Sequence, residues 1–261
     1  MHLELQGKVA VVTGASNGIG LAVTTALAAE GALVVAGSRD GSEELDALVA
    51  SGAAKSVVVD LCTASGPADL AAVALARGAI DILINNVGGA HRRVGGFLSI
   101  TDKDWASTMN LNLMAAVRMT RAVLPSMIAA GGGAIVTMSS VNAFLPDPAV
   151  LDYSASTAAV ANFSKSLSKE VAQHNIRVNT VSPGPVSTAR WLGKGGVAQT
   201  VARATGGDPA AVAQQAAADA ATGRFTTPEE VADLMLFLSS ARAATVTGAD
   251  FTIDGGLIKT L

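Results

Sequence analysis

The chain has 261 residues, half of them hydrophobic, with 27 glycines and a net charge of −3. This length permits one large α/β domain or two small ones, and the weak negative charge gives no support for a nucleic-acid partner. Cys62 is the only cysteine, which excludes an intramolecular disulfide and fits a reducing compartment. The first six residues lack the apolar core of a signal peptide. The longest uncharged stretch, 122–146, contains Pro125 and three glycines. We therefore expect a soluble cytoplasmic protein without a membrane span.

Short β-branched runs alternate with segments of helical spacing along the whole chain. Strands are expected at 9–13, 33–36, 56–59, 80–84, 134–138, 177–181 and 249–253, and helices at 19–30, 42–51, 67–77, 104–130, 152–173 and 228–239. Such alternation is typical of βαβ units, in which helices cover both faces of a parallel sheet. The run Thr227-Pro228-Glu229-Glu230 provides a capping threonine and a proline at the first helical position. No linker or internal repeat divides the chain, so we expect a single α/β domain.

Residues 189–226 have a different composition, with six glycines among alanine-rich pieces of helical spacing. A connection of this length in a compact domain is usually functional, and often forms a lid over a site. We expect a substrate-binding lid here, and the alternative is a flexible excursion without a role.

A glycine-rich turn, Thr13-Gly14-Ala15-Ser16-Asn17-Gly18-Ile19-Gly20, separates the first expected strand from the first helix. Glycines let the backbone approach a pyrophosphate closely, and a helix N-terminus presents free N–H groups with partial positive charge. The spacing differs from the common G-x-G-x-x-G. We expect a dinucleotide to be bound by Gly14, Ser16, Asn17, Gly18, Ile19 and Gly20. The alternative is a tight turn that binds nothing.

The second expected strand is followed by Gly37-Ser38-Arg39-Asp40, where a dinucleotide fold reads the adenosine ribose. A neutral donor beside a guanidinium suits the 2′-phosphate of NADP, whereas an acidic side chain in the first position would select NAD. The sequence therefore favours NADP(H). NAD(H) remains the less favoured alternative, because Asp40 can neutralise Arg39.

Polar side chains also follow the third and fourth expected strands. Asp60, with Leu61 after it, can accept a hydrogen bond from an adenine amino group. Asn86, Val87 and Gly88 can clamp backbone and ribose. Ligands of open α/β sheets bind at this carboxyl edge of the strands, so these five residues are candidate cofactor contacts.

Tyr153 is the only tyrosine in the chain, and it follows Ser140 by thirteen residues. Ser140 comes just after the fifth expected strand and Tyr153 starts a long helix, so both can face one crevice. A phenol and a hydroxyl directed at one carbonyl provide a proton donor and a stabiliser of developing negative charge.

Taken together, these motifs resemble the short-chain dehydrogenase/reductase family over essentially the whole chain. The resemblance is carried by residues 13–20, Asp60, 85–88, Asn112, Ser140, Tyr153, Pro183-Gly184, Thr247-Gly248 and Asp254-Gly255-Gly256. It implies a single-domain Rossmann fold with a seven-stranded parallel sheet, hydride transfer between NAD(P) and a carbonyl or alcohol, and commonly a homotetramer. It also implies that Tyr153 is the acid/base, that Ser140 orients the substrate oxygen, and that Asn112 holds a relay water. By the same resemblance, the nicotinamide is lined by Pro183, Gly184, Val186 and Thr188.

The chain departs from the family at one position, because the lysine of the Tyr-x-x-x-Lys pattern is replaced by Thr157. A cation about 4 Å from the phenol is worth ~4 kcal/mol at an effective dielectric of 20, or about three pKa units. Lys165 lies ~12 Å further along the helix axis and is too distant to substitute. Thr157 keeps a hydroxyl for the ribose but supplies no charge. We therefore expect Tyr153 to titrate high, with reduced turnover and with reduction favoured over oxidation.

The substrate pocket is expected between residues 89–97, residues 141–144 and the lid, with Asn142, Phe144 and Trp191 as substrate contacts. These side chains favour an NADPH-dependent reductase of a small-molecule carbonyl, such as a 3-oxoacyl thioester or another apolar ketone. Two alternatives stay open. One is a catalytically weak NADP-binding sensor or scaffold, and the other is an NAD-linked polyol or hydroxysteroid dehydrogenase. The sequence contains no cluster with metal-ligand spacing.

Overall fold

A computed structural model of the protein describes residues 2–260. Seven parallel strands form one sheet in the order β3-β2-β1-β4-β5-β6-β7. The strands are β1 (Val9–Thr13), β2 (Leu33–Ser38), β3 (Ala54–Val58), β4 (Ile80–Asn85), β5 (Gly133–Met138), β6 (Ile176–Pro183) and β7 (Asp250–Ile253). The expected seven-stranded parallel sheet of a single Rossmann-type domain is confirmed.

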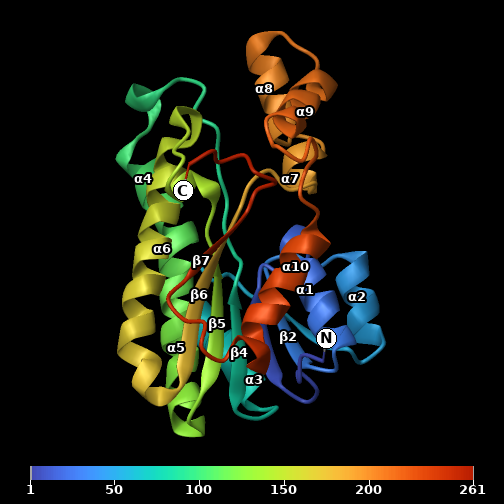
Figure 1. Ribbon diagram of the computed structural model, residues 1–261, viewed down its shortest axis with the longest axis vertical. Helices are drawn as coiled ribbons and strands as arrows, with labels where there is room; N and C mark the ends of the chain where they lie inside the picture. The colour runs from blue at the N-terminus through green and yellow to red at the C-terminus, as the bar shows by residue number, and fades with distance from the viewer. Residues whose placement is uncertain (1, 261) are drawn as a thin grey trace.

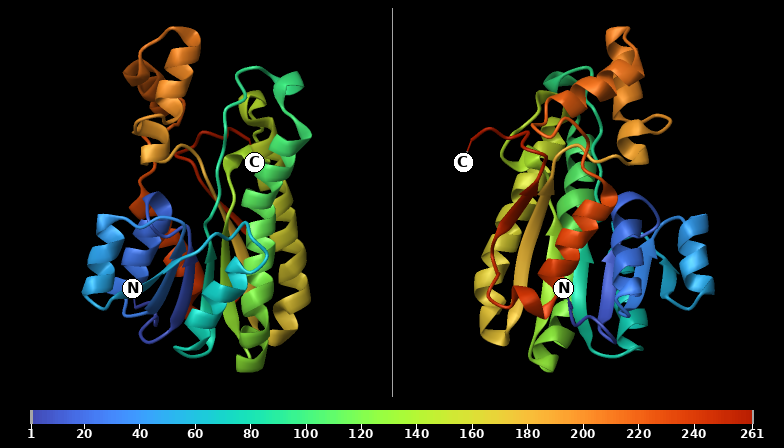
Figure 2. Two further views of the ribbon diagram at one scale, coloured as in Figure 1. Left: turned by 180° about the vertical axis from the view of Figure 1, so that it is seen from behind. Right: turned by 45° about the vertical axis from the view of Figure 1, so that its right-hand side comes forward.

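Helices cover both faces of this sheet (Figures 1 and 2). One face carries α1 (Gly18–Ala29), α2 (Glu43–Ala50) and α10 (Pro228–Ser239). The other carries α3 (Gly66–Leu75), α5 (Ala115–Ala130) and α6 (Leu151–Val171). The interior strands must therefore be apolar on both sides. In β1, Ala10 and Val12 pack toward α1 and α10, whereas Val9 and Val11 pack toward α3 and α5.

The helix expected over residues 104–130 is divided in the structure, which corrects that prediction. It begins with α4 (Asp102–Met109) and ends with α5, and the π-helical turn Asn110–Met114 lies between them. Such wide turns are often found at functional sites. Here the widened turn contains Asn112, whose buried side chain bonds to a loop at the edge of the sheet.

The run Asp102–Ala130 is also the one helical run among residues 2–260 that is long and apolar enough to cross a membrane. In this fold it lies along β4 and β5 and against α3 and α6. Only 28% of its most apolar 18-residue window is buried, so much of its surface stays uncovered in a single chain.

The segment that we expect to act as a lid, residues 189–226 and called the lid below, contains α7 (Ala189–Leu192), α8 (Val197–Thr205) and α9 (Pro209–Ala218). Figures 1 and 2 show α8 and α9, coloured orange, projecting beyond the end of the sheet. The two ends of the lid are held together at its base. Val186 pairs with Thr226 as a parallel bridge, and the Ser187 N–H donates to the Thr226 carbonyl at 2.9 Å.

Candidate active site

A cavity of about 820 Å³ lies at the carboxyl ends of the strands, and we call it the rim cavity. The chain reverses its direction across the sheet between β1 and β4, which is where ligands of open α/β sheets bind. The lid covers one side of this space. Of the candidate residues, the rim cavity is lined by Gly14, Ser16, Asn17, Gly18, Ile19, Ser38, Arg39, Asp60, Leu61, Asn86, Val87, Gly88, Ser140, Asn142, Tyr153, Pro183, Gly184, Val186, Thr188 and Trp191.

Four candidate residues do not line the rim cavity: Gly20, Asn112, Phe144 and Thr157. Phe144 is 49% exposed, and the next residue, Leu145, lines the cavity in its place. The short 3-10 helix Val141–Ala143 ends just before Phe144, and the role of Phe144 as a substrate contact stays a prediction.

The glycine loop after β1 leaves no room for a side chain at Gly20, where it passes into α1. A Cβ on Gly20 would lie 2.0 Å from the Gly14 carbonyl oxygen, which is backbone and cannot move aside cheaply. Gly14 and Gly18 have φ values of +65° and +52°, in the left-handed region that favours glycine. Asn17 precedes α1 in extended conformation and makes no side-chain cap, so the first-turn N–H groups of α1 lack that partner. The loop fits a pyrophosphate at a helix N-terminus.

Asn86 and Thr13 fasten the glycine loop to the end of β4. The Asn86 Nδ2 donates to the carbonyl oxygens of Thr13 and Gly14 at 3.0 and 3.1 Å. The Thr13 Oγ1 accepts from the Asn86 and Val87 N–H groups at 2.9 and 3.1 Å. Both hydrogen bonds of the Asn86 side-chain nitrogen therefore hold the glycine loop in place.

The adenosine end of the rim cavity contains Ser38, Arg39 and Asp60. Ser38 is buried and its Oγ donates to the Asp40 carbonyl at 2.9 Å. Arg39 is exposed, and no ion pair joins it to Asp40 within residues 2–260. The Asp60 Oδ1 accepts from the Cys62 N–H at 2.9 Å. The guanidinium therefore keeps its charge available for an anion at this end.

At the other end, the structure brings Tyr153 and Ser140 to the same cavity. Tyr153 sits in the first turn of α6, and Ser140 precedes the short 3-10 helix after β5. The Ser140 Oγ accepts from the Asn142 N–H at 3.2 Å. Burial raises the pKa of the Tyr153 phenol above its ordinary value, while the Ser140 hydroxyl and the charge of Arg190 lower it by less. The structure thus adds burial to the missing lysine as a second cause of the high pKa of Tyr153.

A second, inner cavity of about 30 Å³ lies behind Tyr153, lined by Asn86, Val87, Gly88, Asn112, Met138, Ser139, Tyr153, Thr157 and Val160. This space is large enough for one water molecule.

The Thr157 Oγ1 lies 3.1 Å from the Tyr153 carbonyl and 3.0 Å from that of Ser154, to which it donates. The hydroxyl hydrogen expected to face the ribose is thus engaged within its own helix. Lys165 was expected to be too distant to substitute, and the structure shows in addition that its Nζ donates to the Gly248 carbonyl at 2.6 Å.

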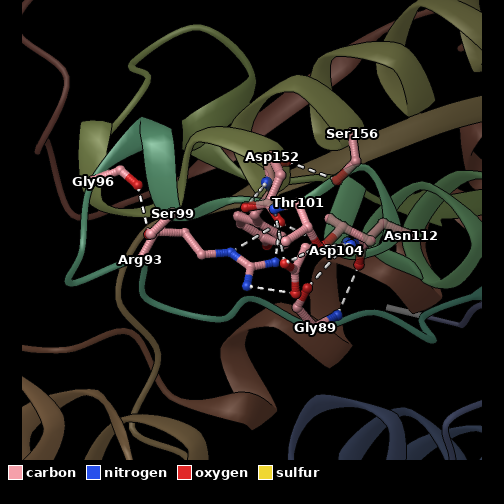
Figure 3. Close-up of polar contacts among 11 residues, drawn as sticks. Gly89, Arg93, Gly96, Ser99, Thr101, Asp104, Asn112, Asp152 and Ser156 are labelled. Carbon is pink, nitrogen blue, oxygen red and sulfur yellow. Dashed lines mark hydrogen bonds and ion pairs between the residues drawn. The ribbon is translucent and has the colours of Figure 1, made fainter. Parts of the chain in front are cut away.

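Asn112 holds the loop that follows β4. Its Oδ1 accepts from the Gly89 N–H at 2.7 Å, and its Nδ2 donates to the Gly89 carbonyl at 3.0 Å (Figure 3). The side chain therefore positions the cavity wall, and its part in a water relay remains a prediction.

A buried carboxylate, Asp152, ties the same loop to the start of α6 (Figure 3). It accepts from the Arg93 Nε at 3.2 Å and from the Thr108 Oγ1 at 2.7 Å, and Arg93 also pairs with Asp104 at 3.2 Å. Burial raises the pKa of Asp152, but the hydrogen bonds from Arg93 and Thr108 and the arginine charge outweigh it, so the net pKa is lowered. Sequence reasoning missed this network because its members are far apart in the chain.

Sequence reasoning also missed Arg190, which lines the rim cavity from α7. Its Nη2 donates to the Gly88 carbonyl at 2.9 Å. The available signal was a cationic residue two positions after the candidate cofactor residue Thr188, at the start of the expected lid.

Comparison with known proteins agrees with this geometry. A sequence profile described as short chain dehydrogenase matches residues 8–195. The chain is 35% identical over 262 residues to 3-oxoacyl-[acyl-carrier-protein] reductase FabG of Thermotoga maritima, covering 98% of this chain and 100% of that protein. It is 39% identical to D-threitol dehydrogenase of Mycolicibacterium smegmatis, covering 97% of this chain and 94% of that protein.

Among solved structures, the chain is similar to L-sorbose reductase from Gluconobacter frateurii complexed with NADPH and L-sorbose. The TM-score is 0.91, with 36% identity and complete coverage of both chains. The profile covers more than half of the chain, and each of these relatives exceeds 30% identity over nearly all of it. The chain therefore belongs to the short-chain dehydrogenase/reductase family of NAD(P)-dependent oxidoreductases.

Proposed function

We propose that the protein is an NADPH-dependent carbonyl reductase in which Tyr153 donates the proton to the substrate oxygen. The observation that carries the proposal is the continuity of the rim cavity, which runs from Arg39 to the chain's only tyrosine with Ser140 beside it. The similarity to a sorbose reductase complexed with NADPH supports the choice of cofactor.

The residues around the rim cavity fit a dinucleotide phosphate. Ser38 and Arg39 would hold the 2′-phosphate, and the glycine loop at the start of α1 would hold the pyrophosphate. The nicotinamide would be lined by Pro183, Gly184, Val186 and Thr188. When bound, NADPH supplies the hydride for reduction.

The protein's own contribution to the chemistry is a proton at the Tyr153 oxygen. Because burial raises the pKa of this phenol above its ordinary value, the phenol stays protonated at pH 7. The protonated phenol is the form that donates to a ketone oxygen, and the Ser140 hydroxyl would stabilise the developing negative charge. Alcohol oxidation requires the phenolate, so it should appear mainly at alkaline pH.

The substrate end has both apolar and polar walls. Leu145, Val150 and Trp191 provide apolar surface and favour a 3-oxoacyl thioester or another apolar ketone. Asn142 and Asp147 also line the cavity and can hydrogen-bond hydroxyl groups. These polar groups favour a second candidate, the interconversion of a polyol and a keto sugar. The names of the threitol and sorbose relatives point in the same direction.

The test is NADPH consumption with a panel of 3-oxoacyl thioesters, apolar ketones and keto sugars, repeated with NADH. Fluorescence of bound NADPH reports binding separately from turnover. We expect turnover in at least one class, and a loss of about 100-fold or more in Tyr153→Phe with NADPH binding retained. Binding of NADPH without turnover on any substrate would favour a cofactor-bound sensor over a reductase. Full activity in Tyr153→Phe would refute Tyr153 as the proton donor.

We also propose that the protein forms a homotetramer in the cytoplasm. The support is the apolar helical run Asp102–Ala130, of whose most apolar window only 28% is buried in one chain, together with the single unpaired Cys62. Light scattering of the purified protein would show the mass of four chains, and a monomer at micromolar concentration would contradict the assembly.

A further inference from the structure

Arg190 places a positive charge at the wall of the rim cavity that also contains Tyr153. Its Nη2 donates to the Gly88 carbonyl at 2.9 Å. A Cβ on Gly89 would lie 3.4 Å from the Arg190 Nη1, so the guanidinium is in contact with this glycine pair. The guanidinium therefore contacts the loop after β4, while the residue as a whole is exposed to solvent.

The backbone that carries Arg190 is fixed at the base of the lid. Residue 190 lies within α7, where the Trp191 and Leu192 N–H groups donate to the Thr188 carbonyl at 3.0 and 2.9 Å. The rings of Trp191 and Phe225 meet edge to face, with centroids 5.4 Å apart. The guanidinium thus belongs to the anchored end of the lid and not to its projecting helices.

Most other charges near Tyr153 are compensated within the described chain. Arg92 pairs with Asp147 at 3.6 Å, and Arg93 pairs with Asp152 and Asp104, whereas Asp219 has only a neutral partner and accepts from the Gln215 amide at 2.8 Å. His91 also lines the cavity. The remaining charged lining residues, Arg39, Asp40 and Asp60, lie at the adenosine end. Arg190 has no acidic partner within residues 2–260.

The other side of Tyr153 offers no cation. None of the nine residues that line the inner cavity carries a charge, and Thr157 occupies the lysine position of the family pattern. Lys165, the next lysine along α6, is bonded to the Gly248 carbonyl.

We propose that Arg190 supplies, from the lid side of Tyr153, the positive charge that the Tyr-x-x-x-Thr sequence lacks. This inference rests on the proposed function, in which Tyr153 is the proton donor. Arg190 acts on the phenol through its charge and on the cavity wall through Gly88, so it is a positioning residue. A nearby cation stabilises the phenolate, and the charge of Arg190 does lower the pKa of Tyr153 against the opposing effect of burial.

The single tyrosine makes a direct test possible without cofactor or substrate. The near-ultraviolet absorbance of tyrosinate is read in the first milliseconds after jumps to a series of alkaline pH values, before global unfolding. Arg190→Gln removes the charge, Arg190→Lys retains it, and Lys194→Gln is the matched control. Lys194 is an exposed cation of the same lid that does not line the rim cavity. Thr157→Lys shows how the tyrosinate absorbance of Tyr153 responds to a positive charge placed on the inner-cavity side of the phenol.

We expect the pKa of Tyr153 to rise by about one unit in Arg190→Gln, at the lower end of what a neighbouring opposite charge produces. The shift should shrink with added salt because the guanidinium is partly solvated. Arg190→Lys should recover most of it, and Lys194→Gln should show no shift.

An unchanged titration in Arg190→Gln, or an equal shift in Lys194→Gln, would overturn the inference. A raised KM for anionic substrates with an unchanged titration would overturn it too, and would assign Arg190 to substrate binding. These outcomes are separable from a failure of the proposed function, which is decided by turnover in Tyr153→Phe.

Discussion

The carboxyl rim of the sheet and the lid face the same cavity but are held in different ways. At the rim, Gly20 has no room for a Cβ, and Asn86 is bonded to two backbone carbonyls of the glycine loop. In the lid, α9 has no buried residue, and α8 buries only Ala198 and Ala202. Few buried contacts are typical of segments that move or vary. We therefore predict that the rim is a fixed site suited to a constant group and that the lid is an adaptable cover suited to a variable substrate.

This difference also decides what the sequence could reveal. The rim was predicted from local patterns, because strand ends, glycines and helix starts follow from residues close together in the chain. β1 and α10 lie at the expected residues, and the capping box of Thr227 and Glu230 is present. The contacts of Arg93 with Asp152 and of Arg190 with Gly88 join residues 59 and 102 positions apart. Contacts between residues so far apart in the chain have no local signature, so they required the structure.

The largest effect is expected at Asp152, which fixes the loop after β4 beyond the rim, and it is an effect on stability. Replacing Asp152 by alanine leaves Arg93 without its buried partner, and loss of one member of such a pair destabilises a protein by about 3–5 kcal/mol. Urea unfolding measures this change. The matched control is Asp102→Ala, which removes an exposed acid at the start of α4. Equal stability of the two variants would mean that the loop after β4 is not fixed by this network.

Asp152 also predicts a pH dependence with a definite sign. Its pKa is lowered in the folded protein, so its contribution to stability is present above the unfolded value of about 3.9 and is lost as the pH falls through the folded pKa. The stability difference between the wild type and Asp152→Asn should therefore shrink as the pH falls below about 4. Urea midpoints at pH 7, 5 and 3 would reveal it, and a difference that grew on acidification would contradict the assigned sign.

Two glycines, Gly20 in the rim and Gly207 in the lid, allow the two regions to be compared by the same substitution. Gly20→Ala places a Cβ 2.0 Å from the Gly14 oxygen, whereas in Gly207→Ala the nearest atom is the Thr205 Oγ1 at 3.3 Å. The forced shift of the glycine loop should weaken NADPH binding by about tenfold or more, as expected for overpacking that costs 1–3 kcal/mol. Gly207→Ala should bind NADPH normally. Fluorescence titration measures the NADPH affinity of each variant. Similar affinities in the two variants would mean that the rim is no more tightly constrained than the lid.

Arg39 sharpens the comparison within the rim itself. Arg39→Ala removes a solvent-accessible guanidinium that has no acidic partner among residues 2–260. Loss of a hydrogen bond to a charged group is worth about 1.5–3 kcal/mol, so NADPH affinity should fall by about 10- to 100-fold. NADH affinity should be unchanged because it has no 2′-phosphate. A parallel loss for both cofactors would indicate that Arg39 supports the fold and does not read the phosphate.

The smallest effect is expected at Trp191, which links the base of the lid to the substrate end of the cavity. Its ring meets Phe225 edge to face, a contact worth about 0.5–1.5 kcal/mol beyond simple burial. Trp191→Ala should therefore raise the KM for the carbonyl substrate by about three- to tenfold, with NADPH affinity unchanged. Leu192→Ala is the control, because Leu192 is 49% exposed and does not line the cavity. Steady-state kinetics at saturating NADPH separate the two variants. If Trp191→Ala weakened NADPH as strongly as substrate, the lid would be part of the fixed site, and the division between a constant rim and an adaptable cover would fail.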